Sequence, residues 1–204
     1  MKVAIIGGTG KLGMGLAARL SEKLEVQIGS RDRSKAQRAA AQIPGVTGGE
    51  EIEVASSCDA AVLAIPYEAV TRLGALEAAL ADKLVISPVV PIKQVGGIFY
   101  YGLENGSAAE EVASKLRRSR IAAALHTVPS RYFKGVKEAI DVPVASNDKR
   151  TYEEAARMIS SIDGVRPLYA GPLSIASTIE MLTPLLLNLA KLNGVRAPSL
   201  KFVS

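Results

Sequence analysis

The feature that most constrains the fold of this chain is a glycine-rich turn close to its start. The apolar run KVAII, residues 2–6, leads directly into GGTGKLG, where Gly8, Gly10 and Gly13 have the spacing G-x-G-x-x-G. A helical pattern begins within the same segment. A turn of this kind lets the backbone approach a pyrophosphate closely and presents free helix N–H groups to it. We therefore predict a dinucleotide site at this turn.

Strand-like and helix-like segments alternate along the rest of the chain. Strands are expected at residues 25–30, 60–66, 83–91, 120–127, 141–146 and 165–171, and helices at 12–23, 34–43, 67–82, 107–119, 151–162 and about 175–192. Nearly continuous apolar strands alternating with helices are typical of a parallel sheet covered on both faces. We expect an α/β fold: a Rossmann-type doubly wound, mainly parallel sheet with a small C-terminal helical extension. Residues 1–146 would form the dinucleotide domain and 147–204 a small α/β segment.

Three expected helix starts carry a hydroxyl residue followed three positions later by Glu or Gln. In that arrangement the hydroxyl accepts a hydrogen bond from the amide three residues on. The pattern predicts helix caps at Ser34 with Gln37, at Ser107 with Glu110 and at Thr151 with Glu154.

The end of the second expected strand reads Gly29-Ser30-Arg31, where NAD-binding proteins of this type place an acidic residue. An arginine there accommodates a 2′-phosphate, and Ser30 adds a hydroxyl. Lys35 falls in the first turn of the next helix, where the helix dipole favours an anion. With Thr9 on the glycine turn, these residues predict NADP rather than NAD, and a solvated basic loop is the alternative. Asp32 is expected to face solvent.

Prolines end three of the expected strands, at Pro66, at Pro88 and Pro91, and at Pro129. Because proline cannot donate to a strand ladder, it stops pairing. These ends lie on the carboxyl edge of a parallel sheet, where ligands bind in such folds. The residues expected to line the groove there are Ile65, Val90 and Ser130. Ordinary strand termination by proline remains an alternative at each of these places.

The composition narrows the chemistry. The 204 residues include one cysteine and one histidine, Cys58 and His126, which exclude an intrachain disulfide and a zinc site of the usual kind. Cysteine usage points to a reducing compartment, so we expect the cytoplasm. The net charge of +5 with only 4% aromatic residues favours a small anionic ligand over single-stranded nucleic acid. The apolar segment 181–190 is too short to span a bilayer, so we expect no membrane partner.

Segments along nearly the whole chain resemble one known family, the F420-dependent NADP reductases or NADPH:F420 oxidoreductases. They are GGTGKLG, GSRDRSK, LAIPYEA, ISPVVP, ALHTVPSRYF, IDGVRPLYAGPLS and LTPLLLNLAKLNG. The resemblance implies an enzyme that moves a hydride between NADP and the deazaflavin coenzyme F420. Members of the family are usually dimers from archaea and some bacteria.

The resemblance also implies which residues bind the two cofactors. Thr9, Gly10, Lys11 and Leu12 would contact the pyrophosphate, and Ser30, Arg31 and Lys35 would hold the 2′-phosphate. Ile65, Val90 and Ser130 would line the nicotinamide side, and Thr183 and Pro198 would lie near the deazaflavin, although the tail GVRAPSLKF departs most from the family's pattern. Candidate cations for the acidic deazaflavin tail are Arg131, Lys134, Lys137, Arg196 and Lys201.

The scarcity of catalytic side chains agrees with this chemistry, because hydride transfer between two redox cofactors needs neither a nucleophile nor a metal. Two interpretations of His126, at a strand end near the cleft, stay open with at least equal weight on the second: it helps to orient the deazaflavin or stabilises charge on it, or it is a packed or capping histidine. Three other functions stay open: NADPH reduction of FMN or FAD on the same fold, reduction of a small imine or keto acid, and a non-enzymatic NADP-binding redox sensor.

The last expected helix also predicts an assembly. Its leucines form a stripe too wide for one half-buried face, which indicates that part of the helix lies in a homodimer interface. They are Leu182, Leu185, Leu186, Leu187 and Leu189.

Overall fold

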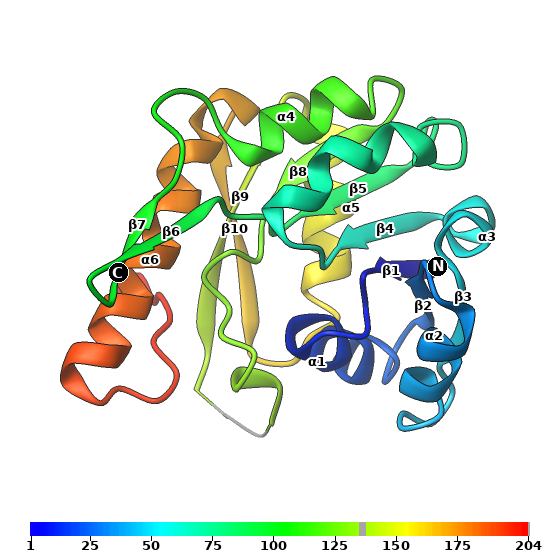
Figure 1. Cartoon of the computed structure of the whole chain (residues 1–204), viewed down its shortest axis with the longest axis horizontal. Coiled ribbons are helices and arrows are strands. Elements are labelled where there is room, and N and C mark those ends of the chain that lie inside the picture. The colour runs from blue at the N-terminus through cyan, green and yellow to red at the C-terminus, as the bar shows by residue number, and fades with distance from the viewer. Residues whose placement is uncertain (135–137, 204) are drawn as a thin grey trace.

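The computed structural model describes residues 1–134 and 138–203, and in this part of the chain one eight-stranded sheet runs through the molecule (Figure 1). Its strand order is β10-β9-β8-β5-β4-β1-β2-β3, and β6 and β7 form a separate hairpin. The strands are β1 (Lys2–Ile6), β2 (Glu25–Ser30), β3 (Thr47–Glu50), β4 (Ala60–Leu63), β5 (Leu84–Ser87), β6 (Ile92–Val95), β7 (Ile98–Tyr101), β8 (Arg120–Ala123), β9 (Ile140–Ser146) and β10 (Val165–Gly171).

Helices cover both faces of this sheet. They are α1 (Lys11–Leu20), α2 (Arg33–Ala40), α3 (Glu51–Ser57), α4 (Ala108–Lys115), α5 (Lys149–Ile159) and α6 (Ala176–Asn193), with 3₁₀ helices η1 (Tyr67–Leu76), η2 (Tyr132–Lys134) and η3 (Leu173–Ile175). Alternate residues of each strand face opposite sides. Val3 and Ile5 of β1 join a core with α1, α2 and α5, whereas Ala4 and Ile6 join a second core with α3, η1 and α4. The expected doubly wound sheet is confirmed.

The order of the strands places a crevice beside β1. From β1 the chain runs outward to β2 and β3, then returns to β4 on the other side of β1. All these strands are parallel. Ligands in such sheets bind at the carboxyl ends of the strands where the direction of winding reverses. The glycine turn after β1 therefore lies at the position that the topology makes available for a ligand.

The far end of the sheet departs from a purely parallel arrangement. β9 runs antiparallel to β8 through the pairs Ala122↔Ser146 and Ala123↔Ala145, and β10 is parallel to β9. Both strands belong to the same sheet as the glycine turn, and α5 packs on β9 and β8. The division of the chain at residue 146 stays a prediction.

Several expected elements have different limits. The segment 67–82 forms the 3₁₀ helix η1 over Tyr67–Leu76 instead of a long α-helix. The strand expected at 83–91 ends at Ser87, because Pro88 and Pro91 cannot donate to the ladder. β3, α3 and the β6–β7 hairpin were not expected from the sequence.

Aspartates replace two of the three expected helix caps. Ser107 caps α4 as predicted, with its Oγ accepting from the Glu110 amide at 3.1 Å. The caps expected at Ser34 and Thr151 are wrong. Asp32 accepts from the amide of Lys35 at 3.0 Å, and Asp148 accepts from the amide of Thr151 at 2.8 Å. A carboxylate accepts a stronger hydrogen bond than a hydroxyl, so both helices begin earlier. Asp32 is exposed as expected, but its carboxylate is engaged in the cap.

Helix α6 fastens the outer elements to the sheet through buried polar contacts. Glu180 is fully buried and accepts hydrogen bonds from the amides of Ala108 and Ala109 at 3.0 Å each and from Tyr101 Oη at 2.7 Å. Asn188 binds the backbone N–H and C=O of Phe99 in the hairpin, at 2.9 and 2.8 Å. The carboxylate thus ties α6 to both α4 and β7, which fixes the helix relative to the rest of the fold.

The stretch Leu173–Asn193 is long and apolar enough, by length and composition alone, to cross a membrane. Core helices of globular proteins meet the same criterion. Here the stretch contains the buried Glu180, whose hydrogen bonds all go to neighbouring elements of the protein.

Candidate functional site

The turn between β1 and α1 brings the backbone into unusually close contact. A Cβ added at Gly13 would lie 2.5 Å from the Cα of Gly8, and one at Gly8 would lie 2.8 Å from the carbonyl oxygen of Ile5. A Cβ at Gly10 would meet only the carbonyl oxygen of Gly7, at 4.0 Å. Gly8 and Gly13 therefore allow the helix to pack against the strand, while the space beside Gly10 stays open to a ligand.

The start of α1 can bind an anion. Gly10 is the N-cap residue, and no side chain caps the helix. The N–H groups of a first helical turn have no partners within the helix, and the helix dipole makes this end positive. Thr9, Gly10 and Lys11 are all exposed here. This geometry suits a phosphate or pyrophosphate group.

A hollow of about 320 Å³ extends from this turn across the ends of β2 and β4, and we call it the Arg31 hollow. Its polar lining comes from the turn, the end of β2 and the start of α2, with Glu51 of α3 and Arg72 of η1, and its apolar lining comes mainly from the end of β4 and from η1. Of the predicted residues it collects Thr9, Gly10, Ser30, Arg31, Lys35 and Ile65. Of these predicted residues, two cations and two hydroxyls therefore stand beside the uncapped helix start, as the NADP prediction requires.

A second hollow, of about 410 Å³, lies beside Leu12 at the start of α1, and we call it the His126 hollow. It is formed by residues 126–131 after β8, by α6, by the C-terminal tail and by Ile92 of the hairpin. Of the predicted residues it collects Leu12, His126, Ser130, Thr183 and Pro198. The leucines of α6 and Pro198 give it apolar walls suited to a flat ring.

His126 enters this hollow as a neutral imidazole. The residue is buried, and burial lowers the pKa of its ring to about 3. In the described part of the chain neither ring nitrogen has a hydrogen-bond partner. Leu125, directly before it, has the left-handed φ of 71°, which is strained for a leucine. Thr183 Oγ1 donates to the carbonyl oxygen of His126 at 3.0 Å, so α6 holds this strained segment in place.

The C-terminal tail reaches the His126 hollow because it is anchored to β9. Asp141 is buried, and both of its oxygens pair with Arg166, at 2.6 and 2.8 Å. The same carboxylate accepts from the amide of Phe202 at 2.6 Å, and the Asp141 amide donates to the carbonyl of Leu200. The Arg166 guanidinium lowers the pKa of Asp141, so the anchor stays charged. It holds the tail a few residues past Pro198.

A third hollow, of about 560 Å³, joins the first two, and we call it the Met14 hollow. It shares Thr9 and Gly10 with the Arg31 hollow and Ser130 and Arg131 with the His126 hollow, and it contains Lys11. The three hollows therefore adjoin around the glycine turn. A ligand bound at the turn can reach both the cationic hollow and the apolar one.

Some predicted residues lie elsewhere. Val90 is half-buried in the loop after β5 and is not among the described residues that line these three hollows. Arg131 and Arg196 line the His126 hollow. Lys137 lies outside the described residues, as does the side chain of Lys134.

Two charged residues of the Arg31 hollow were not predicted from the sequence. Glu51 begins α3, in a segment for which no element was expected, and Arg72 lies on η1. The pairing of β3 with β2 and the packing of Glu51 against Gly29 bring the start of α3 to this hollow.

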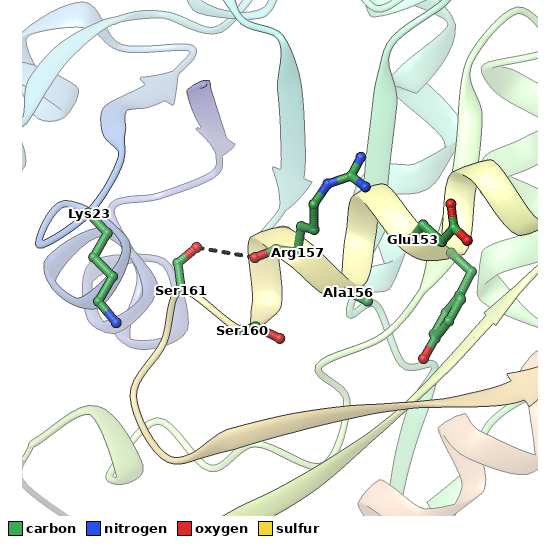
Figure 2. A pocket seen from close by; sticks show the side chains of 7 residues that line it. Lys23, Glu153, Ala156, Arg157, Ser160 and Ser161 are labelled. Carbon is green, nitrogen blue, oxygen red and sulfur yellow. Dashed lines mark hydrogen bonds between the residues drawn. The ribbon is translucent and has the colours of Figure 1, made fainter.

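A separate hollow of about 470 Å³ lies between α5 and the end of α1 (Figure 2). Its lining includes Lys23, Arg157, Ser160 and Ser161 and shares no residue with the three adjoining hollows. Lys23 is already bound to Asp163 at 2.6 Å. The hollow lies at the C-terminal end of α5, where the helix dipole disfavours anions. We therefore place the functional site at the three adjoining hollows.

Comparison with known proteins agrees with this site. Residues 2–91 match the family described as "NADP oxidoreductase coenzyme F420-dependent". A F420-dependent NADP reductase of Methanothermobacter thermautotrophicus is 38% identical over 221 residues, covering 100% of this chain and 95% of that protein. The F420-dependent NADP reductase of Methanocaldococcus jannaschii is 32% identical, covering 98% of this chain and 100% of that protein.

A solved structure has the same fold. The crystal structure of a putative F420-dependent NADP reductase from Arthrobacter sp. FB24 superimposes with a TM-score of 0.89 at 23% identity, and the match covers 100% of both chains. At this identity the likeness concerns the fold alone. The full-length identities to the archaeal enzymes carry the assignment: the chain belongs to the family of F420-dependent NADP reductases.

Proposed function

We propose that the protein transfers a hydride directly between NADP(H) and coenzyme F420. The main support for the proposal is that two hollows of different chemistry, one cationic and one apolar, lie around the same glycine turn. The Arg31 hollow offers cations beside an uncapped helix start, and the His126 hollow offers apolar walls. The relatives that match over the full length bear the name of this activity.

The residues present fit NADP at the first hollow. The open space beside Gly10 and the uncapped start of α1 suit the pyrophosphate. Arg31, Lys35 and the Ser30 hydroxyl would hold the 2′-phosphate. From the turn, the nicotinamide end would extend past Leu12 toward Ser130, which borders the His126 hollow. Ile65 at the end of β4 and Val90 after β5 would flank that path.

The residues of the second hollow fit a deazaflavin ring. Thr183 and Pro198 would contact the ring from α6 and from the anchored tail. His126 would border the ring with an imidazole whose two nitrogens are buried and have no partner in the described chain. Since its pKa is about 3, it would do so uncharged at neutral pH. Arg131 and Arg196 would meet the acidic tail of F420 at the rim.

When bound, the two rings themselves supply the donor and acceptor carbons of the hydride. The chain's own residues have the tasks of holding the rings in contact and excluding water. α6 contributes to both, because Glu180 and Asn188 fix it against α4 and β7 while Thr183 ties it to the strand-end segment at His126. We assign no catalytic side chain and no metal to the reaction.

The other candidate functions are less well supported. The full-length relatives carry neither the name of a flavin reductase nor that of an imine reductase. A redox sensor that only bound NADP would not need the second apolar hollow. We also propose that the enzyme works in the cytoplasm without nucleic-acid or membrane partners; the buried, unpaired Cys58 suits a reducing compartment.

The activity is tested by following NADPH absorbance with F420, FMN, FAD or no acceptor. We expect rapid oxidation with F420 only. Thr183→Trp should abolish the reaction by filling the His126 hollow, while NADPH binding measured by calorimetry stays unchanged. Thr178→Trp, at an exposed threonine of the same helix, is the control and should stay active. Oxidation with FMN or FAD but not with F420 would replace the deazaflavin proposal by a flavin reductase.

Arg31 should determine the choice between NADPH and NADH. A hydrogen bond to a charged group contributes about 1.5–3 kcal/mol, less where solvent screens it, so Arg31→Ala should weaken NADPH binding by about tenfold. NADH binding should hardly change. Arg33→Ala is the matched control, because Arg33 pairs with Glu53 at 2.8 Å and does not line the hollow. Equal losses for both cofactors in a calorimetric titration would remove Arg31 from this role.

We propose in addition that the enzyme is a homodimer joined through α6. Met181, Leu185, Leu189 and Leu192 recur at helical spacing and are 43–66% exposed, whereas Leu186 on another face is buried. Such a stripe of exposed large apolar residues marks an interaction surface. Beside it, the hairpin exposes Ile92 and Val95.

Sedimentation at micromolar concentration should give about twice the 21.4 kDa chain mass. The double variant Leu185→Lys with Leu189→Lys should sediment as a monomer, since two charges would enter an apolar interface. Ile52→Lys, at an equally exposed position on α3, should leave the dimer intact. A monomeric wild-type protein would contradict the proposal.

A further inference from the structure

The Arg31 hollow contains one carboxylate among its charged residues, and the other charged residues there are cations. Glu51 is half-buried, and in the described chain it has no hydrogen-bond or ion-pair partner for its side chain. Its neighbours differ: Glu50 is exposed outside the hollow, and Glu53 is paired with Arg33. Glu51 is held close to the end of β2, since a Cβ at Gly29 would lie 3.3 Å from the Glu51 Cα.

Two sides of the Arg31 hollow differ in chemistry, one being cationic and polar and the other mainly apolar. Arg31, Lys35 and Ser30 lie at the end of β2 and the start of α2. The opposite lining is mainly apolar and comes from η1 and the residue before it, through Pro66, Ala69, Leu73 and Leu76. A phosphate suits the first side, and a flat heteroaromatic ring suits the second. Glu51 and Arg72 are the charged residues that remain in the lining once the phosphate side is assigned.

We propose that Glu51 and Arg72 recognise the adenine base of the dinucleotide, with Glu51 accepting from its exocyclic amino group and Arg72 stacking on its face. The inference rests on the NADP part of the proposed function. An ionised carboxylate can only accept hydrogen bonds, so it matches an amino group and repels a carbonyl at the same place. A guanidinium plane stacks on aromatic rings, and Arg72 stands next to Leu73 on the apolar wall.

The arrangement also explains how an acid can stand in a phosphate-binding hollow. With the 2′-phosphate held by Arg31 and Lys35, Glu51 would face the base and not the phosphate. The residue would then set base specificity, while the pair of cations sets the preference for the phosphorylated ribose.

The test compares NADPH with its hypoxanthine analogue, in which a carbonyl replaces the amino group. Binding is measured by calorimetry without any acceptor, so the outcome does not depend on F420 activity. The wild-type protein should bind NADPH about tenfold more tightly than the analogue, since a site built to bind an amino group rejects a ligand that lacks it. Failure to bind NADPH at all would instead count against the proposed function.

Glu51→Gln should bring the two dissociation constants to within about twofold, because an amide can either donate or accept. Glu51→Ala should also lose the discrimination, through weaker NADPH binding, and it provides a second reading if the first variant folds poorly. Glu53→Gln is the matched control and should keep the wild-type ratio. Equal binding of both nucleotides by the wild type, or an unchanged ratio in Glu51→Gln, would overturn the assignment.

Arg72 is tested on NADPH and NADH together. Arg72→Ala should weaken both by the same factor, about threefold to tenfold, because both carry adenine and stacking does not involve the phosphate. Arg117→Ala, an exposed arginine on the surface beyond α4, should change neither. Loss of NADPH binding alone would show that Arg72 binds the phosphate, and the stacking role would be wrong.

Discussion

The close contact between the start of α1 and the end of β1 is the constraint on which the rest of the structure depends. Gly8 and Gly13 approach so closely that a side chain on either would collide with backbone atoms. Gly7, with a φ of 74°, allows the turn, and a Cβ there would lie 2.7 Å from the carbonyl oxygen of Ala64. The turn is thereby fitted between β1 and β4, where the winding of the sheet reverses and where its free N–H groups can bind a ligand.

The second half of the site depends on polar anchors in the C-terminal part of the chain. Glu180 and Asn188 fix α6 to α4 and to the hairpin, and Asp141 fixes the tail to β9. In this part of the chain, side-chain hydrogen bonds fix the positions of the site residues. The glycine turn is instead positioned by the backbone pairing of β1 with its neighbouring strands. The polar anchors bring Thr183 and Pro198 to His126, although both residues are far from it in the sequence.

Most of the fold could be predicted from the sequence, because near-continuous apolar strands such as VAII and AAVL occur only where both sheet faces are covered. The misses have different causes. The hairpin Ile92–Tyr101 does carry a sequence signal, a Gly96-Gly97 turn followed by the apolar run IFYY, which the prediction of elements did not use. Asn188 of α6 then holds the hairpin in place. At the starts of α2 and α5 an aspartate and a hydroxyl residue both lie within reach of the helix amides. The local backbone geometry makes Asp32 and Asp148 the caps. The predicted phosphate residues gather in one hollow because they follow adjacent strands, whereas Glu51 joins them only through the packing of α3 over Gly29.

Direct hydride transfer requires the nicotinamide and deazaflavin rings to meet at the His126 hollow, which the Met14 hollow joins to the Arg31 hollow. The most direct test uses NADPH deuterated at carbon 4, on each of its two faces in turn, with F420 as acceptor in ordinary water. We expect that one of the two labelled forms passes its deuterium to the reduced deazaflavin and that the other passes none, because the site would hold the nicotinamide with one face toward the acceptor. Reduced deazaflavin that contains only solvent hydrogen with both labelled forms would contradict direct transfer.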